Sequence, residues 1–348
     1  MVKKIPVGIL GATGSVGQRF VQLLSDHPWF EITALAASER SKGKSYKDAV
    51  QWLMPTPLSS KIANLTIQPC DPDLSCRIVF SGLDSDVAGE IETQFARAGK
   101  IVFSNAKNHR WDKDVPLLVP EVNADHLQLI KQQNFGGGAI ITNPNCSTVG
   151  LVMALKPLHD AFGLREVFVV TMQALSGAGY PGVASLDILD NVIPYIGGEE
   201  EKVQSEPRKI LGKLTNGSIE LLELPISAHC NRVAVFDGHT ECVSVRLSRK
   251  ADEQAVIDAW QSFTAEPQRL QLPSAPENPT RYFAEDRYPQ PRLHRDSGKG
   301  MTVSVGRLRK CPLLDYKFVL LSHNTIRGAA GGAILNAELL VKQELVPL

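Results

Sequence analysis

The chain has 348 residues, which is more than one compact core usually holds, so we expect two domains. Hydrophobic residues make up 43% of the chain and charged residues 21%, as in ordinary globular proteins. The 37 basic residues equal the 37 acidic residues in number, which argues against a nucleic-acid or anionic-membrane partner. No apolar run approaches the roughly 18 residues of a membrane span.

The cysteines predict the compartment. There are six of them, they form no CxxC pair, and no signal peptide precedes them. We therefore expect free thiols in a reducing, cytoplasmic location. No spacing of cysteine, histidine and acidic residues matches a metal site, so we expect no catalytic metal.

A glycine loop follows the first predicted strand. Residues 4–10 are a β-type run that leads into GATGSVGQRFVQLL, where apolar residues recur at helical spacing. This order suits a dinucleotide, because the glycines allow a tight turn and the helix N-terminus faces the pyrophosphate. A plain strand–turn–helix connection is the alternative. The loop residues expected to bind the cofactor are Gly11, Thr13, Gly14, Ser15, Val16 and Gly17.

The second predicted strand, residues 30–37, ends in SERSKGK. NAD-preferring sites usually place an acidic residue here for the ribose hydroxyls. In this chain Ser38, Arg40 and Ser41 surround a single acid, Glu39. Hydroxyl and basic groups suit a 2′-phosphate, so we predict NADP(H), with a solvated loop as the alternative.

Four further strands complete a predicted parallel sheet, at residues 77–80, 101–103, 118–120 and 139–142. Ligands bind at the carboxyl ends of strands in such sheets. We expect Ser81 and Gly82, after the first of these strands, to contact the cofactor. Arg110, after the second of these strands, is a candidate anion-binding residue. An ordinary surface arginine is the alternative interpretation.

The sequence TNPNCST, residues 142–148, places Cys146 directly before the apolar run 149–155. At the start of a helix, unpaired N–H groups and the helix dipole favour a thiolate. The same N–H groups can hold an oxyanion on the carbon that the sulfur attacks. We predict a nucleophile, with an ordinary buried thiol as the alternative.

From about residue 166 the pattern changes to that of an α+β domain. Strands are expected at 167–173 and 241–247, and helices at 187–196, at 199–211 and from residue 324 to the C-terminus. The last helix is dense in small residues and is expected to pack on the first domain. Residues 273–292 show little periodicity, and we interpret them as a long loop.

Several polar residues of this half could act in a site. Glu199 and Lys202 are one helical turn apart, for which a solvated ion pair is the default interpretation. Arg232 precedes a short apolar run that we expect to be a strand. His239 follows an Asp-Gly turn, where a histidine is free to titrate, and we prefer it to His229 as a general base.

Taken together, these motifs resemble the aspartate-semialdehyde dehydrogenase family over essentially the whole chain. The segments that carry the resemblance are GATGSVGQ, SNAKNHRWDKDVPLLVPEVN, TNPNCSTVG, QALSGAGYPG, EEEKVQSEPRKIL, NRVAVFDGHTE and NTIRGAAGG. The second is similar to the archaeal or fungal type. The resemblance implies a Rossmann-type doubly wound parallel sheet plus an α+β catalytic and dimerisation domain similar to that of glyceraldehyde-3-phosphate dehydrogenase. The implied domains are 1–145, completed by helix 324–348, and 146–323.

The resemblance also implies a reaction, the NADPH-dependent reduction of L-aspartyl-4-phosphate to L-aspartate 4-semialdehyde and phosphate through a thioester on cysteine. Cys146 is then the nucleophile, His239 the general acid/base and Gln173 the substrate-orienting residue. The other implied assignments are Arg232 for the substrate carboxylate, Glu199 for its ammonium with Glu200 and Glu201 as competitors, Lys202 and Arg110 for phosphate, Asn145 for fixing the site, and Ser176, Gly177 and Asn324 for the cofactor.

Two other functions stay open on the sequence. One is a related acyl reductase, such as malonyl-CoA reductase or, more distantly, N-acetylglutamyl-phosphate reductase. The other is a non-catalytic dinucleotide-binding protein on the same scaffold. The family resemblance further implies a homodimer or homotetramer, with the sheet of the second domain as the contact.

Overall fold

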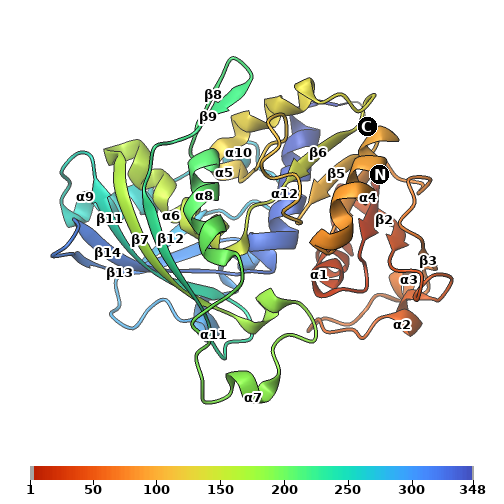
Figure 1. The fold of residues 1–348 in the computed structure, drawn as a ribbon, viewed down its shortest axis with the longest axis horizontal. Helices are drawn as coiled ribbons and strands as arrows, with labels where there is room; N and C mark the ends of the chain where they lie inside the picture. Colours follow the sequence, from red (N-terminus) through yellow and green to blue (C-terminus); the bar gives the residue numbers. More distant parts are fainter. Residues whose placement is uncertain (1–3, 347–348) are drawn as a thin grey trace. The chain divides into compact units, whose positions relative to one another are not determined.

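The computed structural model describes residues 4–346, so residues 1–3 of the expected first domain and 347–348 of the expected last helix lie outside the described residues. The chain divides into two compact units (Figure 1). The first unit comprises Met1–Leu118, Asp125–Asn143 and Ala329–Leu348, and the second comprises Val119–Ala124 and Pro144–Gly328. Residues 119–124 and 324–328 therefore group with the second unit.

Six parallel strands form the sheet of the first unit, in the order β3-β2-β1-β4-β5-β6. The chain moves outward on one side of β1 and then on the other, so the order reverses between β1 and β4. The central strands are buried on both faces, as a parallel sheet covered by helices requires. The strands are β1 (Ile5–Leu10), β2 (Phe30–Ala36), β3 (Ile67–Gln68), β4 (Ile78–Ser81), β5 (Ile101–Ser104) and β6 (Ala139–Thr142).

This sheet confirms the predicted fold class but corrects one strand. Residues 118–120 are not a strand: Leu117 forms a single bridge to Thr142, and helix α5 (Pro120–Asn123) then begins. Pro120 has no N–H with which to continue a ladder, which explains the break. The sixth strand is instead β3, which the sequence did not indicate and which pairs with the end of β2.

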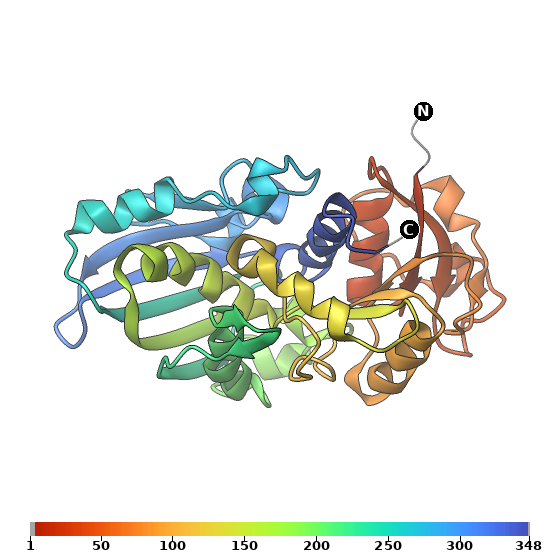
Figure 2. The same ribbon diagram turned by 90° about the horizontal axis from the view of Figure 1, so that it is seen from above.

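Helices cover the first unit. They are α1 (Ser15–Leu24), α2 (Tyr46–Ala49), α3 (Ser60–Ala63), α4 (Ser85–Arg97), η1 (Ala124–Gln132) and α12 (Gly331–Lys342). Helix α12, dark blue in Figure 2, packs against β5. Glu338 of α12 lies 2.7 Å from the ring of His27 in a buried pair. The predicted helix from residue 324 starts later, as the π-helix η4 (Ile326–Ala330) followed by α12.

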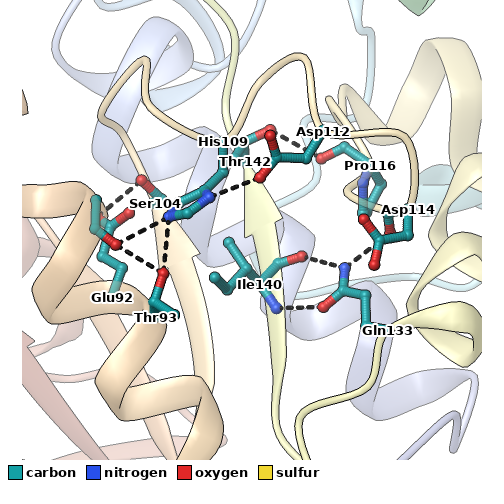
Figure 3. Close-up of polar contacts among 11 residues, drawn as sticks. Glu92, Thr93, Ser104, His109, Asp112, Asp114, Pro116, Gln133, Ile140 and Thr142 are labelled. Atoms are coloured by element: carbon teal, nitrogen blue, oxygen red, sulfur yellow. Dashed lines mark hydrogen bonds and ion pairs between the residues drawn. The ribbon is translucent and has the colours of Figure 1, made fainter.

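A network of polar contacts ties the loop after β5 to the sheet of the first unit (Figure 3). His109 lies 2.8 Å from Asp112 and also contacts Gly89 and Thr93 of α4. On the other side of the network, Gln133 donates to the Ile140 and Asp114 carbonyls and accepts from the Ile140 N–H. The loop that carries Arg110 is therefore fixed at both ends.

A mixed sheet organises the second unit, in the order β10-β7-β11-β14-β13-β12. Pairs β10·β7 and β13·β12 are parallel, and the other pairs are antiparallel. The strands are β7 (Leu164–Gln173), β10 (Ile226–Arg232), β11 (His239–Leu247), β12 (Thr280–Phe283), β13 (Val303–Lys310) and β14 (Tyr316–Ser322), and β8 (Lys213–Thr215) pairs with β9 (Ser218–Glu220) in a separate hairpin.

One face of the mixed sheet is buried and the other is open. Helices α6 (Cys146–Phe162) and α9 (Glu253–Gln261) contact its strands, and α8 (Glu199–Ile210) contacts β10. Trp260 of α9 is fully buried and donates from its indole to the Ala154 carbonyl of α6 at 2.9 Å. The strands alternate buried and more exposed residues, so the opposite face is left uncovered within the described chain.

Three expectations for this half were wrong. Residues 187–196 are not a helix, since α7 spans only Ser185–Ile188 and Pro194 follows. Residues 233–236 form no strand, because Arg232 already ends β10. The expected loop 273–292 contains β12 and the start of α11 (Pro291–His294). The remaining short helices are η2 (Leu175–Ala178), α10 (Glu266–Arg269) and η3 (Ser297–Gly300). Within residues 4–346, the longest apolar helices still fall short of what crossing a membrane requires.

Candidate active site

Helix α6 presents Cys146 as its first residue, as the sequence predicts. Asn145 caps this helix, and its side-chain oxygen accepts the N–H groups of Ser147 at 3.0 Å and Thr148 at 3.2 Å. Cys146 is half-buried. Cys230, by contrast, is fully buried, and burial raises the pKa of its thiol to about 12. The helix terminus therefore distinguishes Cys146 from an ordinary buried thiol.

His239 is the partner of Cys146. Its Nε2 lies 3.2 Å from the Cys146 sulfur, and its Nδ1 accepts the Ala174 N–H at 3.0 Å. His239 begins β11 and is completely buried. Burial, together with the charge of Arg232, lowers the pKa of His239 to about 3. The expectation of a histidine free to titrate on a turn was therefore wrong, because the ring is enclosed at the end of a covered strand.

Arg232 and Gln173 end two neighbouring strands. They pair in register in the parallel ladder of β10 and β7, so both side chains leave the same face of the sheet. The guanidinium of Arg232 is buried and donates to the Ala174 carbonyl at 2.7 Å. Burial lowers the pKa of Arg232, and the neighbouring Cys146 and Glu199 oppose that shift. His229, the competitor to His239, is exposed, and its ring meets the Phe168 ring edge to face.

Glu199, the first residue of α8, accepts three hydrogen bonds in the site. Asn145 donates to its carboxylate at 2.7 Å, Gln173 at 3.1 Å and Lys202 at 2.7 Å. Burial raises the pKa of Glu199, but the Lys202 charge and these three donors outweigh it, so the net pKa is lowered. The default interpretation of a solvated ion pair was wrong, because Glu199 is buried and Lys202 is only 26% exposed.

A second group of residues lies around His239 and Cys146. A Cβ on Gly177 would lie 3.0 Å from the Arg232 guanidinium and 3.1 Å from the His239 ring. Asn324 donates to the Ser176 hydroxyl at 2.8 Å, so two of the predicted cofactor residues contact each other. The second unit thus brings together these residues: Asn145, Cys146, Gln173, Ser176, Gly177, Glu199, Lys202, Arg232, His239 and Asn324.

The other predicted residues belong to the first unit. The glycine loop there is a cradle that a side chain would fill. A Cβ on Gly11 would lie 2.7 Å from the Gly82 carbonyl, and one on Gly17 would lie 2.2 Å from the Gly11 carbonyl. Gly14 stands at the N-cap of α1 and supplies no capping side chain, so the helix start is open to an anion. These residues fit a dinucleotide pyrophosphate. Thr13, Ser15 and Val16 lie in the same strand–loop–helix region, and Ser81 ends the neighbouring strand β4, where it pairs with Leu10.

At the end of β2, the chain offers the groups expected for a 2′-phosphate. Ser38 and Arg40 are exposed, and Ser41 is buried with its N–H on the Ser38 carbonyl. Glu39 is directed to Lys42 in an exposed ion pair at 3.2 Å. Arg110 is buried and donates to the Asn105 carbonyl at 2.9 Å, so it belongs to the fixed loop after β5.

Three residues that the sequence analysis missed complete the site. The backbone of Ala174 contacts both His239 and Arg232, and the Glu206 carboxylate accepts the Asn145 N–H at 2.7 Å. A Cβ on Gly328 would lie 2.8 Å from the Cys146 side chain. Glu206 follows Glu199 by two helical turns and so shares its face, which was a usable signal. Residues 4–346 hold no cluster of three metal-ligating side chains.

Comparisons with known proteins show the family to which the chain belongs. The model "Semialdehyde dehydrogenase, NAD binding domain" matches residues 6–130, and "Semialdehyde dehydrogenase, dimerisation domain" matches residues 155–327. The aspartate-semialdehyde dehydrogenases of Archaeoglobus fulgidus and Schizosaccharomyces pombe are each 51% identical to the chain, over 98% of its length and 99% of theirs. The crystal structure of aspartate semialdehyde dehydrogenase with NADP from Candida albicans is 47% identical, with a TM-score of 0.91 over 99% of this chain and 100% of that one. The archaeal and fungal relatives confirm the type that the sequence predicted, and the chain belongs to the aspartate-semialdehyde dehydrogenase family.

Proposed function

We propose that the chain catalyses the reversible NADPH-dependent reduction of L-aspartyl-4-phosphate to L-aspartate 4-semialdehyde and phosphate, in aspartate-family amino-acid biosynthesis. The observation that carries the proposal is the 3.2 Å contact between Cys146 at the start of α6 and the buried His239. Relatives at 51% identity that bear the name of this enzyme support it. The sequence analysis left a related acyl reductase and a non-catalytic binding protein open, and neither gains support from these relatives.

Cys146 performs the covalent chemistry. Its thiolate attacks the acyl carbon of the substrate, the acyl–oxygen bond breaks, and phosphate leaves with that electron pair. The acyl group stays on the sulfur as a thioester. When bound, NADPH supplies the hydride that reduces the acyl carbon. The carbon–sulfur bond then breaks, the aldehyde departs, and Cys146 regains its electron pair.

The neighbours of Cys146 orient the substrate. The Arg232 guanidinium is suited to the planar α-carboxylate, since it presents several donors in one plane. Glu199 carries the negative charge that the substrate ammonium requires. We prefer it to its neighbours, because Glu200 accepts the Cys230 N–H and Glu201 is exposed. Gln173, Asn145 and Lys202 hold Glu199 in place.

For phosphate we propose Lys202, in helix α8, and Arg110, in the fixed loop after β5. Both side chains are cationic. The cofactor is NADP(H), held by the glycine cradle of the first unit, by Ser81 and Gly82, and by Ser38, Arg40 and Ser41 for the 2′-phosphate. Ser176, Gly177 and Asn324 are the proposed cofactor residues of the second unit. The structure solved with NADP supports this choice of cofactor.

We further propose a homodimer or homotetramer that forms through the open face of the mixed sheet. The matched dimerisation domain supports an oligomer. Phe168 and Cys242 are exposed on that face, and Val170 and Met172 are half-buried there. An apolar sheet face of this kind is stabilised when a second copy covers it. We also propose a cytoplasmic location, which the six free cysteines support.

The test is an assay of phosphate-dependent NADP reduction with L-aspartate 4-semialdehyde, run with NAD in parallel. We expect turnover that requires phosphate and prefers NADP. Absence of this activity together with reduction of malonyl-CoA would instead support the related acyl reductase. The variant Cys146→Ala should lose turnover and keep NADP binding; a wild-type protein that binds NADP but turns over nothing would support the non-catalytic alternative.

A further inference from the structure

Helix α6 forms only half of a capping box from its own residues. In a capping box, the N-cap side chain accepts an N–H of the first turn, and a Glu or Gln at position N3 accepts the N–H of the N-cap residue. Asn145 performs the first part, since its side-chain oxygen accepts from Ser147 and Thr148. Position N3 is Thr148, whose buried hydroxyl has no hydrogen-bond partner within residues 4–346. The acceptor for the Asn145 N–H therefore comes from outside the helix.

Glu206 of α8 supplies this acceptor. Its carboxylate accepts the Asn145 N–H at 2.7 Å, and the residue is buried. A buried N–H that loses its acceptor costs free energy, because no water replaces the lost partner. Helix α8 packs against α6, which places a residue of its third turn at the first turn of α6. The second half of the capping box thus comes from a neighbouring helix.

We infer that Glu206 is a positioning residue that completes the cap of α6 from α8 and so fixes the peptide next to Cys146. The inference rests on the proposed function, because Cys146 and Glu199 have their roles only in that reaction. Glu206 acts through Asn145 and does not itself touch the substrate or the cofactor.

The contact of Glu206 reaches two groups of the site through Asn145. The backbone of Asn145 directly precedes Cys146, so loss of the N–H bond loosens the first turn of α6 around the sulfur. The side chain of Asn145 donates to Glu199 at 2.7 Å, so the same loosening reaches the carboxylate that we propose for the substrate ammonium. Glu199 and Glu206 are two turns apart on one face of α8. Asn145 is therefore held by that face at two points, through its backbone and through its amide.

The hydrogen bond of Glu206 can be separated from its charge and from its volume. Glu206→Gln removes the charge but keeps an oxygen that accepts an N–H, as glutamine does at N3 of a capping box. Glu206→Met also lacks the charge and is similar in length, but its thioether is only a weak acceptor. A difference between these two variants therefore reports the hydrogen bond to Asn145.

The test is the rate at which iodoacetamide alkylates Cys146 in the free protein at pH 7. The reaction is followed on the Cys146 peptide by mass spectrometry, because the chain has five other cysteines. The first-turn N–H groups of a helix stabilise a thiolate, and a looser turn does so less well. We expect alkylation to be about threefold slower in Glu206→Met than in Glu206→Gln. Equal rates, or a faster reaction in Glu206→Met, would overturn the inference.

Asp252→Ala is the control for a general loss of stability. Asp252 caps α9 in the same unit, where its carboxylate accepts the Ala255 N–H at 2.8 Å. This variant removes one helix cap elsewhere, so we expect Cys146 to react at the wild-type rate. Slowing as large as that in Glu206→Met would overturn the inference. If Glu206→Met does not fold, Glu206→Ala takes its place, and failure of both to fold would show a folding role instead and overturn the inference as well.

Steady-state kinetics provide a second readout. Glu206→Met should raise the KM for L-aspartate 4-semialdehyde about tenfold relative to Glu206→Gln, because Glu199 loses part of its support. The KM for NADP should be the same in the two variants, since the glycine loop belongs to the first unit. A parallel rise in both KM values would contradict a local effect on the start of α6. The alkylation rate requires no turnover, so failure of this inference is distinct from failure of the proposed activity.

Discussion

The side-chain amide of Asn145 donates to the Glu199 carboxylate at 2.7 Å, while its oxygen caps the helix that begins at Cys146. One residue therefore joins the start of α6 to the start of α8. Its own N–H is held by Glu206, seven residues further along α8. The position of the Cys146 sulfur and the position of the Glu199 carboxylate, which we propose binds the substrate, are thus set by the same side chain.

Replacement of Asn145 should separate stability from activity. Asn145→Ala removes both the cap and the amide donor, so we expect a loss of about 1 kcal/mol in unfolding free energy together with a loss of activity. Asn145→Ser keeps a capping oxygen but loses the donor to Glu199. We expect near wild-type stability in that variant and a roughly tenfold lower kcat/KM. Thermal unfolding and steady-state kinetics measure the two effects. Equal stability of both variants would show that the cap contributes nothing.

Gly177 lies against the side chains of Arg232 and His239, to which we assign roles in the reaction, and this contact predicts an activity defect without a folding defect. In Gly177→Ala the new Cβ would stand 3.0 Å from Arg232 and 3.1 Å from His239, both at side-chain atoms. The displaced side chains should lower kcat/KM by about 10- to 100-fold, which corresponds to roughly 1.4–2.7 kcal/mol. Gly197→Ala is the matched control, because its nearest contact would be the Tyr195 hydroxyl at 3.8 Å. Similar kinetics for the two variants would argue against this close contact.

The sequence predicts the parts of the molecule that depend on local pattern. The helix start at Cys146 and the strand–glycine–helix unit around Gly14 are both where spacing and turn residues indicated them. Contacts distant in the chain were not predictable in this way. The two-residue strand β3 exists only through its pairing with β2, and His239 is buried at the start of β11, the strand on which α6 packs. Ala174 contacts His239 and Arg232 through its backbone. The identity of its side chain therefore gives no information about these contacts.

The close contacts in the glycine loop after β1 predict that Gly17→Ala and Gly14→Ala differ in NADP affinity. A Cβ on Gly17 would lie 2.2 Å from the Gly11 carbonyl, a backbone atom that cannot move without opening the loop. We expect Gly17→Ala to lose about 1–3 kcal/mol of stability and to bind NADP poorly. Gly14→Ala would meet the same carbonyl only at 3.4 Å, so its affinity should change little. Fluorescence titration with NADPH measures both. Equal affinities would contradict a tight cradle.

The position of Arg40 after β2 predicts a preference for NADP over NAD. Its side chain is exposed at the end of β2, beside Ser38 and Ser41. If it binds the 2′-phosphate, Arg40→Ala loses a charge-assisted contact and its KM for NADP should rise about tenfold. The KM for NAD should stay constant, since NAD lacks that phosphate. Parallel kinetics with the two cofactors measure the ratio, and a parallel rise in both KM values would contradict the assignment. Lys47→Ala, also exposed in the first unit, is a control for general loss of positive charge.

The burial of Glu241 predicts that the free energy of unfolding falls as the pH rises. It follows His239 by two residues on β11, is completely buried, and neither carboxyl oxygen has a hydrogen-bond partner within the described chain. Burial therefore raises its pKa well above the ordinary value. For an acid whose folded pKa is raised, the stabilising contribution is complete below the unfolded pKa and is lost as the pH rises through the folded pKa. Glu241→Gln removes the ionisation, so thermal unfolding should match the wild type near pH 4 and exceed it at neutral pH, on the order of 1 kcal/mol or roughly 2–4 °C.

The exposed Glu285→Gln provides the matched control for Glu241→Gln, because it deletes the same charge outside the core. We expect its unfolding temperature to follow that of the wild type at every pH, since a solvated carboxylate gains nothing by losing its charge. Glu241→Gln should then differ from both proteins only above the pH at which an unfolded glutamate ionises. A gain of equal size at low pH would instead indicate better packing of the amide against its neighbours, and it would contradict a neutral buried carboxyl at this position.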